Sequence, residues 1–161
     1  MASARVLAEM TDRAHVVPCA PIAIETTPVM VAGDDENAVQ RIRRVLMGTG
    51  YQVTPGRAGH RMMEDLRRRA DCTLRQCPIE LLVLEGVMRP WVALALVEAV
   101  RGVYPSLPII LCTCSDLEVR KEAKRLAVDV VFEKTPDDEE LRRAALELAP
   151  LLPEVSVGSL N

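Results

Sequence analysis

The sequence predicts an α/β fold in which five parallel strands form one doubly wound sheet covered by five helices. Three observations lead to this prediction. Short apolar runs of strand length alternate with longer segments of helical periodicity between residues 28 and 148. Such alternation is typical of a parallel sheet with helices on both faces. The length of 161 residues, with 49% apolar and 27% charged residues, suits one globular domain with short flanking segments.

The first half of the domain supplies two strands and two helices. Residues 29–32 form an apolar run that ends at a glycine and three acids. Residues 37–47 follow as a helix, which Gly48 and Gly50 terminate. Residues 51–54 are the second strand, and residues 60–70 are the second helix. The inward positions of the two helices are Ala38, Val39, Ile42, Val45, Leu46, Met62, Met63 and Leu66.

The second half supplies three more strands and three helices. Residues 81–84 are apolar without alternation, as in a strand buried on both faces. A helix over 91–103 leads to a fourth strand over 107–113. Ser115 or Asp116 can cap the next helix, which runs to residue 126. Residues 128–132 are the fifth strand, and Asp137 or Asp138 opens a last helix that runs through residue 148.

These elements place the domain at residues 28–149. Residues 1–27 form an N-terminal extension of mixed polarity, in which a short helix over 4–13 is expected. Residues 150–161 form a C-terminal tail without periodicity.

The composition argues against several classes of function. A net charge of −3 gives no electrostatic reason for direct binding of nucleic acid. One Trp, one Phe and two Tyr can hardly supply a base-stacking platform. The five cysteines include no CxxC pair, which argues against a thiolate zinc site. No apolar stretch reaches the length of a membrane span and the first residues lack a secretory pattern, so we expect a cytoplasmic protein without membrane contact.

Polar side chains gather at one edge of the predicted sheet. The loops after parallel strands meet at a single edge, which is where ligand sites form. Carboxylates there can bind a hard cation such as Mg2+, while a hydroxyl and an ammonium can orient a phosphoryl oxygen. The residues at this edge are Asp34 and Asp35 after the first strand, Glu85 and Gly86 after the third, Thr113 at the end of the fourth, and Lys134 at the end of the fifth.

Several segments in the same order point to a known family. They are VAGDDEN at 31–37, GYQV at 50–53, LLVLE at 81–85 followed by VMRP at 87–90, PIILCT at 108–113, and Lys134 with Asp137, Glu140 and Leu141. From residue 29 to residue 148 the chain resembles the receiver domain of response regulators in two-component signalling. The resemblance implies the flavodoxin-like receiver fold, a signalling role rather than an enzymatic one, and protein partners such as a histidine kinase or another regulator.

The chain departs from receivers at the phosphoacceptor. Receivers carry an Asp at the end of the third strand, and this chain has none there. Counting back from Pro90 puts Gly86 in that place. The apolar pattern that follows Glu80 puts Glu85 there instead, with one inserted residue before Pro90. We favour Glu85, because in the other register its carboxylate would face the packed core, where an unpaired charge is costly.

Two further departures concern the switch that receivers use. Val131 stands where receivers usually carry an aromatic residue on the fifth strand, and Thr135 separates Lys134 from Pro136. Together the departures predict a pseudo-receiver that acts through protein contacts, with no required cofactor. The acid pair Asp34 and Asp35 would hold Mg2+ weakly at most, and Thr113 and Lys134 would be remnants of a phosphate pocket.

The role of Glu85 and the partner surface stay open at this point. Glu85 could imitate the charge of the phosphorylated state, or it could pair with Lys134. The resemblance places the partner surface on the helices over 118–126 and 137–148 and the strand between them, and a homodimer is compatible with it. Both helices carry dense mixed charge, which is also typical of a solvated face.

Two other functions were weighed. The first is an active receiver that is phosphorylated with Mg2+ at an unusual acid, Glu85 or Asp35. The second is a small-nucleotide-binding protein on a similar sheet. Its only glycine clusters are at 48–50 and 56–59, and neither follows the first strand with the spacing of a phosphate loop.

Overall fold

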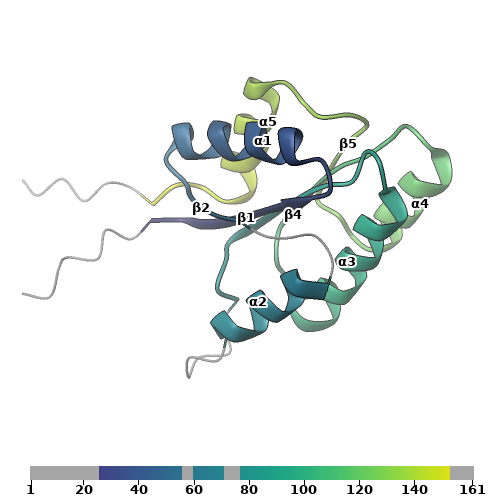
Figure 1. Cartoon of the computed structure of the whole chain (residues 1–161), viewed down its shortest axis with the longest axis horizontal. Helices are drawn as coiled ribbons and strands as arrows, with labels where there is room; N and C mark the ends of the chain where they lie inside the picture. Colours follow the sequence, from purple (N-terminus) through teal and green to yellow (C-terminus); the bar gives the residue numbers. More distant parts are fainter. Residues whose placement is uncertain (1–25, 56–59, 71–76, 153–161) are drawn as a thin grey trace, which may run out of the picture.

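A five-stranded parallel sheet in the order β2-β1-β3-β4-β5 forms the centre of the molecule. The computed structural model describes residues 26–55, 60–70 and 77–152. Helices α1 and α5 cover one face of the sheet, and α2, α3 and α4 cover the other (Figure 1). The elements are β1 (Pro28–Gly33), α1 (Glu36–Thr49), β2 (Gln52–Pro55), α2 (His60–Ala70), β3 (Leu81–Glu85), α3 (Pro90–Val103), β4 (Ile109–Cys112), α4 (Leu117–Arg125), β5 (Val130–Phe132) and α5 (Asp138–Leu148). The predicted fold class is confirmed.

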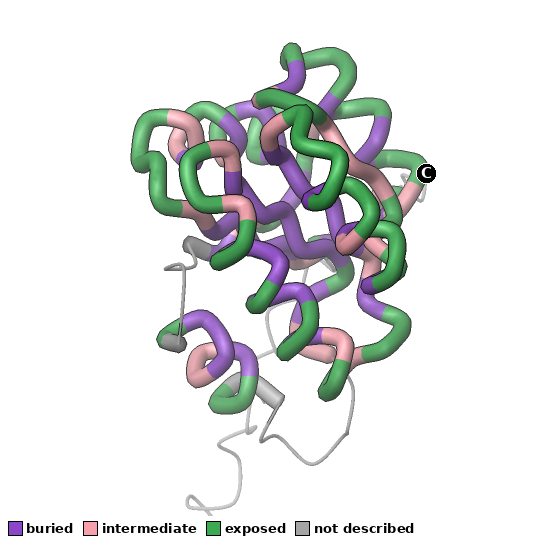
Figure 2. The backbone as a smooth tube through the Cα atoms, turned by 90° about the vertical axis from the view of Figure 1, so that its right-hand side faces the viewer, coloured by how far each residue is buried: buried purple, intermediate pink, exposed green. Residues whose placement is uncertain are grey.

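The core is divided into two apolar layers by the sheet. Alternating residues of β3 point to opposite faces, so that Leu82 and Leu84 pack with α2, α3 and α4 while Leu81 and Val83 pack with α1 and α5. All five residues of β3 are buried, as expected for a central strand with helices on both sides. Figure 2 shows the buried backbone running through the middle of the molecule and the exposed segments at its periphery.

Aspartate side chains begin three of the helices. Asp35 accepts backbone N–H groups at the start of α1, Asp116 at the start of α4, and Asp137 at the start of α5. Of the two alternatives for each later helix, the caps are therefore Asp116 rather than Ser115 and Asp137 rather than Asp138. These caps fix where the loops after β1, β4 and β5 end, and so they shape the carboxyl edge of the sheet.

The fourth and fifth strands are shorter than predicted. β4 ends at Cys112 rather than Thr113, and β5 begins at Val130 rather than at residue 128. β5 ends at Phe132, as the predicted range 128–132 has it, so Lys134 does not lie at the end of the strand. The reason lies in the register: Cys112 pairs with Glu85 on one side and Phe132 on the other, and these are the last residues of their own strands. Thr113 and Lys134 consequently lie in loops beyond the edge of the sheet.

The ends of the described chain pack against the sheet. Thr27 is buried, and its carbonyl accepts a hydrogen bond from Gln52 at 3.0 Å. Leu151 packs against the layer beneath α1 and α5. The helix expected over 4–13 lies outside the described residues, and the division at residues 27 and 149 stays a prediction. Within the described ranges, no helix has the length and apolar character needed to cross a membrane.

Candidate functional site

Glu85 is a buried acid at the carboxyl edge of the sheet. It is the last residue of β3, where it pairs in register with Gly33 of β1 and Cys112 of β4. Only 4% of its surface is exposed. Glutamate is rarely buried to this extent unless its oxygens are hydrogen-bonded, because the loss of water is costly.

Two backbone N–H groups satisfy the Glu85 carboxylate. Oε2 accepts a hydrogen bond from Asp35 N at 3.1 Å, and Oε1 accepts one from Val87 N at 3.0 Å. Hydrogen bonds to a carboxylate are stronger than those between neutral groups. The side chain thus links the β1–α1 loop to the β3–α3 loop across the edge of the sheet. The Glu85 carboxylate is buried, which was expected for the register that puts Gly86 in the phosphoacceptor place. Both of its oxygens are nevertheless hydrogen-bonded.

Two glycines adjoin this carboxylate. A Cβ at Gly33 would lie 2.6 Å from Glu85 Cβ and 2.9 Å from Glu85 Oε2, so only glycine leaves room for the glutamate side chain. A Cβ at Gly86 would lie 2.5 Å from Ala93 Cβ, which brings the backbone close to α3. Of the two candidates for the phosphoacceptor place, Glu85 is the residue whose side chain contacts the loop that carries Asp34 and Asp35.

The acid pair after β1 has two separate structural roles. Asp35 Oδ1 accepts hydrogen bonds from Asn37 N at 3.0 Å and Ala38 N at 3.2 Å, which caps α1. Asp34 is exposed and lies 3.8 Å from Arg89 Nε, measured from its Oδ2. Such exposed ion pairs contribute little to stability. The two carboxylates are therefore engaged with different partners.

The acids at this edge already have hydrogen-bond or ion-pair partners, and the weak Mg2+ binding expected of Asp34 and Asp35 stays a prediction. Mg2+ in proteins takes oxygen ligands from one or two carboxylates in near-octahedral geometry, with several waters. Here Asp35 Oδ1 and both oxygens of Glu85 already accept backbone hydrogen bonds. Across the part of the chain that the structure describes, no group of three or more His, Cys, Asp or Glu residues is arranged to hold a metal ion.

Thr113 and Lys134 make no hydrogen bond or ion pair with Glu85. Thr113 is fully buried, and its hydroxyl has no hydrogen-bond partner among the residues that the structure describes. Lys134 is exposed and forms no ion pair with the residues that the structure describes, so the suggested pairing of Glu85 with Lys134 is absent. Lys134 borders an open hollow beside Ser115 and Phe132, whereas Glu85 borders a recess between β1, β3 and α3.

The recess beside Glu85 is too small for a nucleotide. Its volume is about 10 Å³, which is at the lower limit for one water molecule. Val131, at the predicted switch position, is half-buried and packs toward the layer beneath α2, α3 and α4. A valine there fills less of the space than an aromatic ring would, and it has no polar end with which to respond to Thr113.

Cys112 lies next to Glu85 in the sheet. The pKa of its thiol is raised to about 12, mainly by burial and also by the neighbouring Glu85 carboxylate, while Arg41 acts in the opposite direction. The three residues come from β4, β3 and α1, so they share the face of the sheet that α1 and α5 cover. A neutral thiol is the form that this surrounding favours.

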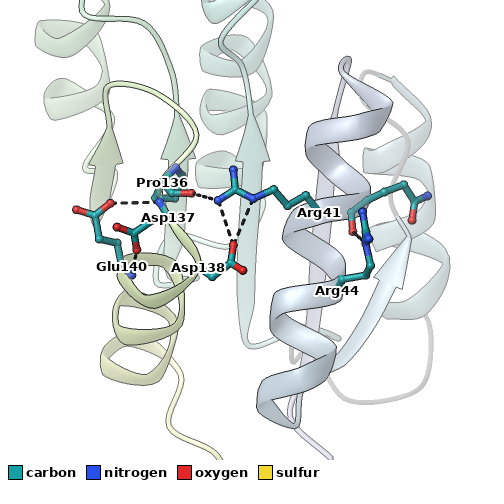
Figure 3. A network of polar contacts seen from close by, with 7 residues as sticks. Arg41, Arg44, Pro136, Asp137, Asp138 and Glu140 are labelled. Atoms are coloured by element: carbon teal, nitrogen blue, oxygen red, sulfur yellow. Dashed lines mark hydrogen bonds and ion pairs between the residues drawn. The ribbon is translucent and has the colours of Figure 1, made fainter.

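Arg41, on α1, makes a contact that the sequence did not predict. Its guanidinium donates to the Pro136 carbonyl at 2.8 Å and to Asp138 Oδ1 at 3.0 Å (Figure 3). These bonds join α1 to the loop before α5, on the same side of the sheet as Glu85. The pattern of Arg41, Arg43 and Arg44 gave no signal for this contact, because the partner is distant in sequence.

Comparisons with known proteins identify the fold. A scan against protein-family models finds no match to the sequence, and a search of curated proteins finds none either. Among solved structures, a response regulator receiver domain protein from Methanospirillum hungatei aligns with a TM-score of 0.63 at 16% identity, over 76% of this chain and 92% of that chain. The chemotaxis protein CheY4 of Vibrio cholerae gives 0.64 at 18% identity, over 76% and 98%.

A third similar structure has a different description. It is a putative pilus assembly protein from Burkholderia thailandensis, with a TM-score of 0.58 at 24% identity, over 76% of this chain and 98% of that chain. All three likenesses cover about the same share of the chain. The chain therefore has the flavodoxin-like receiver fold that the sequence segments indicated.

We predict that Gly33→Ala destabilises the protein by about 2 kcal/mol, because the new methyl group overlaps Glu85 and displaces its hydrogen bonds. Urea unfolding measures the change. Gly48→Ala is the matched control, since a Cβ there meets nothing within 4 Å in an exposed part of α1; it should gain about 0.5 kcal/mol or more. Equal stability of Gly33→Ala and the wild type would contradict the packing described here.

The Cys112 thiol should also make stability depend on pH. In the unfolded chain the thiol loses its proton near pH 9, but in the folded protein its pKa is about 12. The folded state then holds the extra proton, so this contribution is complete below about pH 9 and is lost as the pH rises toward about 12. Between about pH 9 and 10, the stability of wild type should fall more steeply than that of Cys112→Val, by about 1 kcal/mol per pH unit. Parallel pH profiles of stability for the wild type and Cys112→Val would contradict the raised pKa of Cys112.

Proposed function

We propose that the chain is a receiver-like signalling module that does not take up a phosphoryl group in the usual way and acts through protein contacts. One observation carries the proposal: the acid at the end of β3 is a glutamate whose two oxygens both accept backbone hydrogen bonds. A carboxylate used in this way is a structural link between two loops. It is poorly placed to attack a phosphorus atom.

The surrounding residues support the same conclusion. Transfer of a phosphoryl group depends on positioning and on positive charge around its oxygens. Lys134 borders a different hollow from Glu85, and Asp35 is engaged as a helix cap. Glutamate is also one methylene longer than aspartate, and a displacement of about 1 Å can lower a rate about a hundredfold.

We infer that Glu85 holds the loops at this edge in one conformation, so that the module does not switch between two. Its carboxylate supplies a permanent negative group at the edge, and its two bonds hold the β1–α1 and β3–α3 loops together. Val131 lacks the aromatic ring that receivers usually move. We therefore infer that recognition by a partner depends on the single conformation of these loops and on the concentration of the protein.

Protein partners fit the exposed surface better than other classes do. On α4, charges of both signs pair with one another, as Lys121 does with Glu118 and Arg125 with Glu122. On α5, Glu139, Arg143 and Glu147 surround Leu146 in a shallow hollow. Mixed charge of this kind suits a protein surface such as that of a histidine kinase or another regulator, whereas nucleic acid calls for a basic patch.

Incubation with acetyl phosphate and Mg2+ tests the proposal. The wild type should show no added phosphoryl mass in rapid intact-mass measurement. It should also consume no acetyl phosphate beyond the protein-free rate, which covers the case of fast hydrolysis. A receiver with the acceptor aspartate serves as the positive control.

An added phosphoryl mass in the wild type, or consumption of acetyl phosphate above the protein-free rate, would overturn the proposal. The Glu85→Ala variant then locates the acceptor: loss of the signal assigns it to Glu85, and persistence assigns it to another acid such as Asp35. Both results would make the chain an active receiver. Circular dichroism of the variant checks that it remains folded.

A further inference from the structure

Helix α3 is apolar on its outer face as well as on its inner face. Ala93, Leu94, Leu96, Val97 and Val100 are buried against the sheet. The opposite side exposes what we call the α3 outer stripe, in which Trp91 is 56%, Val92 43% and Val103 44% exposed. A helix that is apolar all round is normally buried on all sides. The full stripe is Trp91, Val92, Ala95, Ala99, Gly102 and Val103.

The other helices differ from α3 in this respect. The exposed positions of α1 include Glu36, Arg41 and Arg44, and those of α4 and α5 are mostly charged. Among the described helices, α3 alone exposes a stripe with a single charged side chain, Glu98. Contiguous apolar surface on an otherwise charged molecule marks an interaction site.

Nothing among the described residues requires a glycine at position 102. It lies inside α3 with an ordinary helical backbone, and a Cβ there would meet nothing within 4 Å. Glycine weakens a helix relative to alanine, so packing within one copy would favour a larger residue. A glycine at the surface does allow another helix to approach closely at that point.

We propose that the α3 outer stripe is a self-association surface, on which two copies of this chain pack α3 against α3 in antiparallel orientation. In this orientation Val92 faces Gly102 and the alanines meet at the centre of the stripe, so the two helices can approach closely there. A two-fold axis that crosses the interface at the level of residue 97 gives this arrangement, since the facing positions are then equally distant from residue 97. The facing pairs are Trp91 with Val103, Val92 with Gly102, and Ala95 with Ala99.

The charges near the stripe are compatible with a second copy. A two-fold interface brings a surface against itself, so a surface with charges of one sign would repel its copy. Glu98 stands at the border of the stripe at 3.6 residues per turn, and Arg125 Nη2 lies 3.5 Å from its Oε1. This pairing reduces the one negative charge that the interface would approach.

The size of the stripe sets the expected strength. The 14 residues of α3 make a helix about 21 Å long. A specific interface buries at least about 1,000 Å² in total, and a single pair of helices of this length, with the exposed Met88 beside each, is small by that measure. The dimer should therefore be weak and depend on concentration.

Sedimentation velocity of the full chain, with fluorescence over the same concentration range, tests the proposal. Trp91 is the only tryptophan in the sequence, so its emission reports on the stripe directly. The sedimentation coefficient should rise with concentration while the emission shifts to shorter wavelength. A wild type that stays monomeric with unchanged emission overturns the proposal.

Two variants separate this surface from others. Ala99→Glu places a charge at the centre of the stripe without a buried contact and should remove association. Met47→Glu, the matched control at a 57% exposed site on α1, should associate like the wild type. Association kept in Ala99→Glu or lost in Met47→Glu would place the interface elsewhere and refute the proposal.

Gly102→Ala provides an independent check. It should raise the melting temperature, because alanine favours the helix, and yet weaken association, because the methyl group fills the space opposite Val92 of the second copy. A variant that is more stable and associates at least as tightly as the wild type would contradict the close approach at Gly102. The outcome does not depend on whether the chain takes up phosphate.

Discussion

The two hydrogen bonds to the Glu85 carboxylate are the interaction around which the carboxyl edge of the sheet is organised. A buried carboxylate must be satisfied, and among the described residues two backbone N–H groups from two loops donate to it. This requirement accounts for the absence of a side chain at Gly33. The same carboxylate adds to the raised pKa of Cys112, whose main cause is burial. It also places the N–H of Asp35 where that residue can cap α1 with its own side chain. One glutamate thereby couples two strands, two loops and the start of a helix.

The chain has the receiver fold, but the side chains at the carboxyl edge of its sheet make different contacts from those that the resemblance implies. The acids that a receiver would direct toward one ion have separate partners, since Asp35 caps α1 and Asp34 lies near Arg89. Arg41 ties α1 to the loop before α5 through Pro136 and Asp138. The edge is thus held by static contacts among its own residues. Under the proposed function, such a module would act through the partner that it binds and through its own concentration.

The periodicity of the sequence predicts the elements well, because burial on a sheet face or a helix face leaves a local pattern. All five strands and five helices occur where apolar runs and helical spacing indicate them. β4 was predicted to run one residue too far, because a strand ends where its neighbours end and that depends on register. Glu85 was singled out from the sequence, but its partners Asp35 N and Val87 N carry no side-chain signal. Gly33 could not be interpreted from sequence, since the reason for it lies in Glu85, a neighbour that only the folded chain provides.

Amide hydrogen exchange at Asp35 and Val87 tests the central claim most directly. Both N–H groups lie outside the helices and strands, so the Glu85 carboxylate is what should protect them. The account predicts slow exchange at both amides in the wild type and fast exchange at both in Glu85→Ala, with the core amides of β3 protected in each. Exchange in the wild type as fast as at an unprotected loop amide would show that Glu85 does not hold the two loops together.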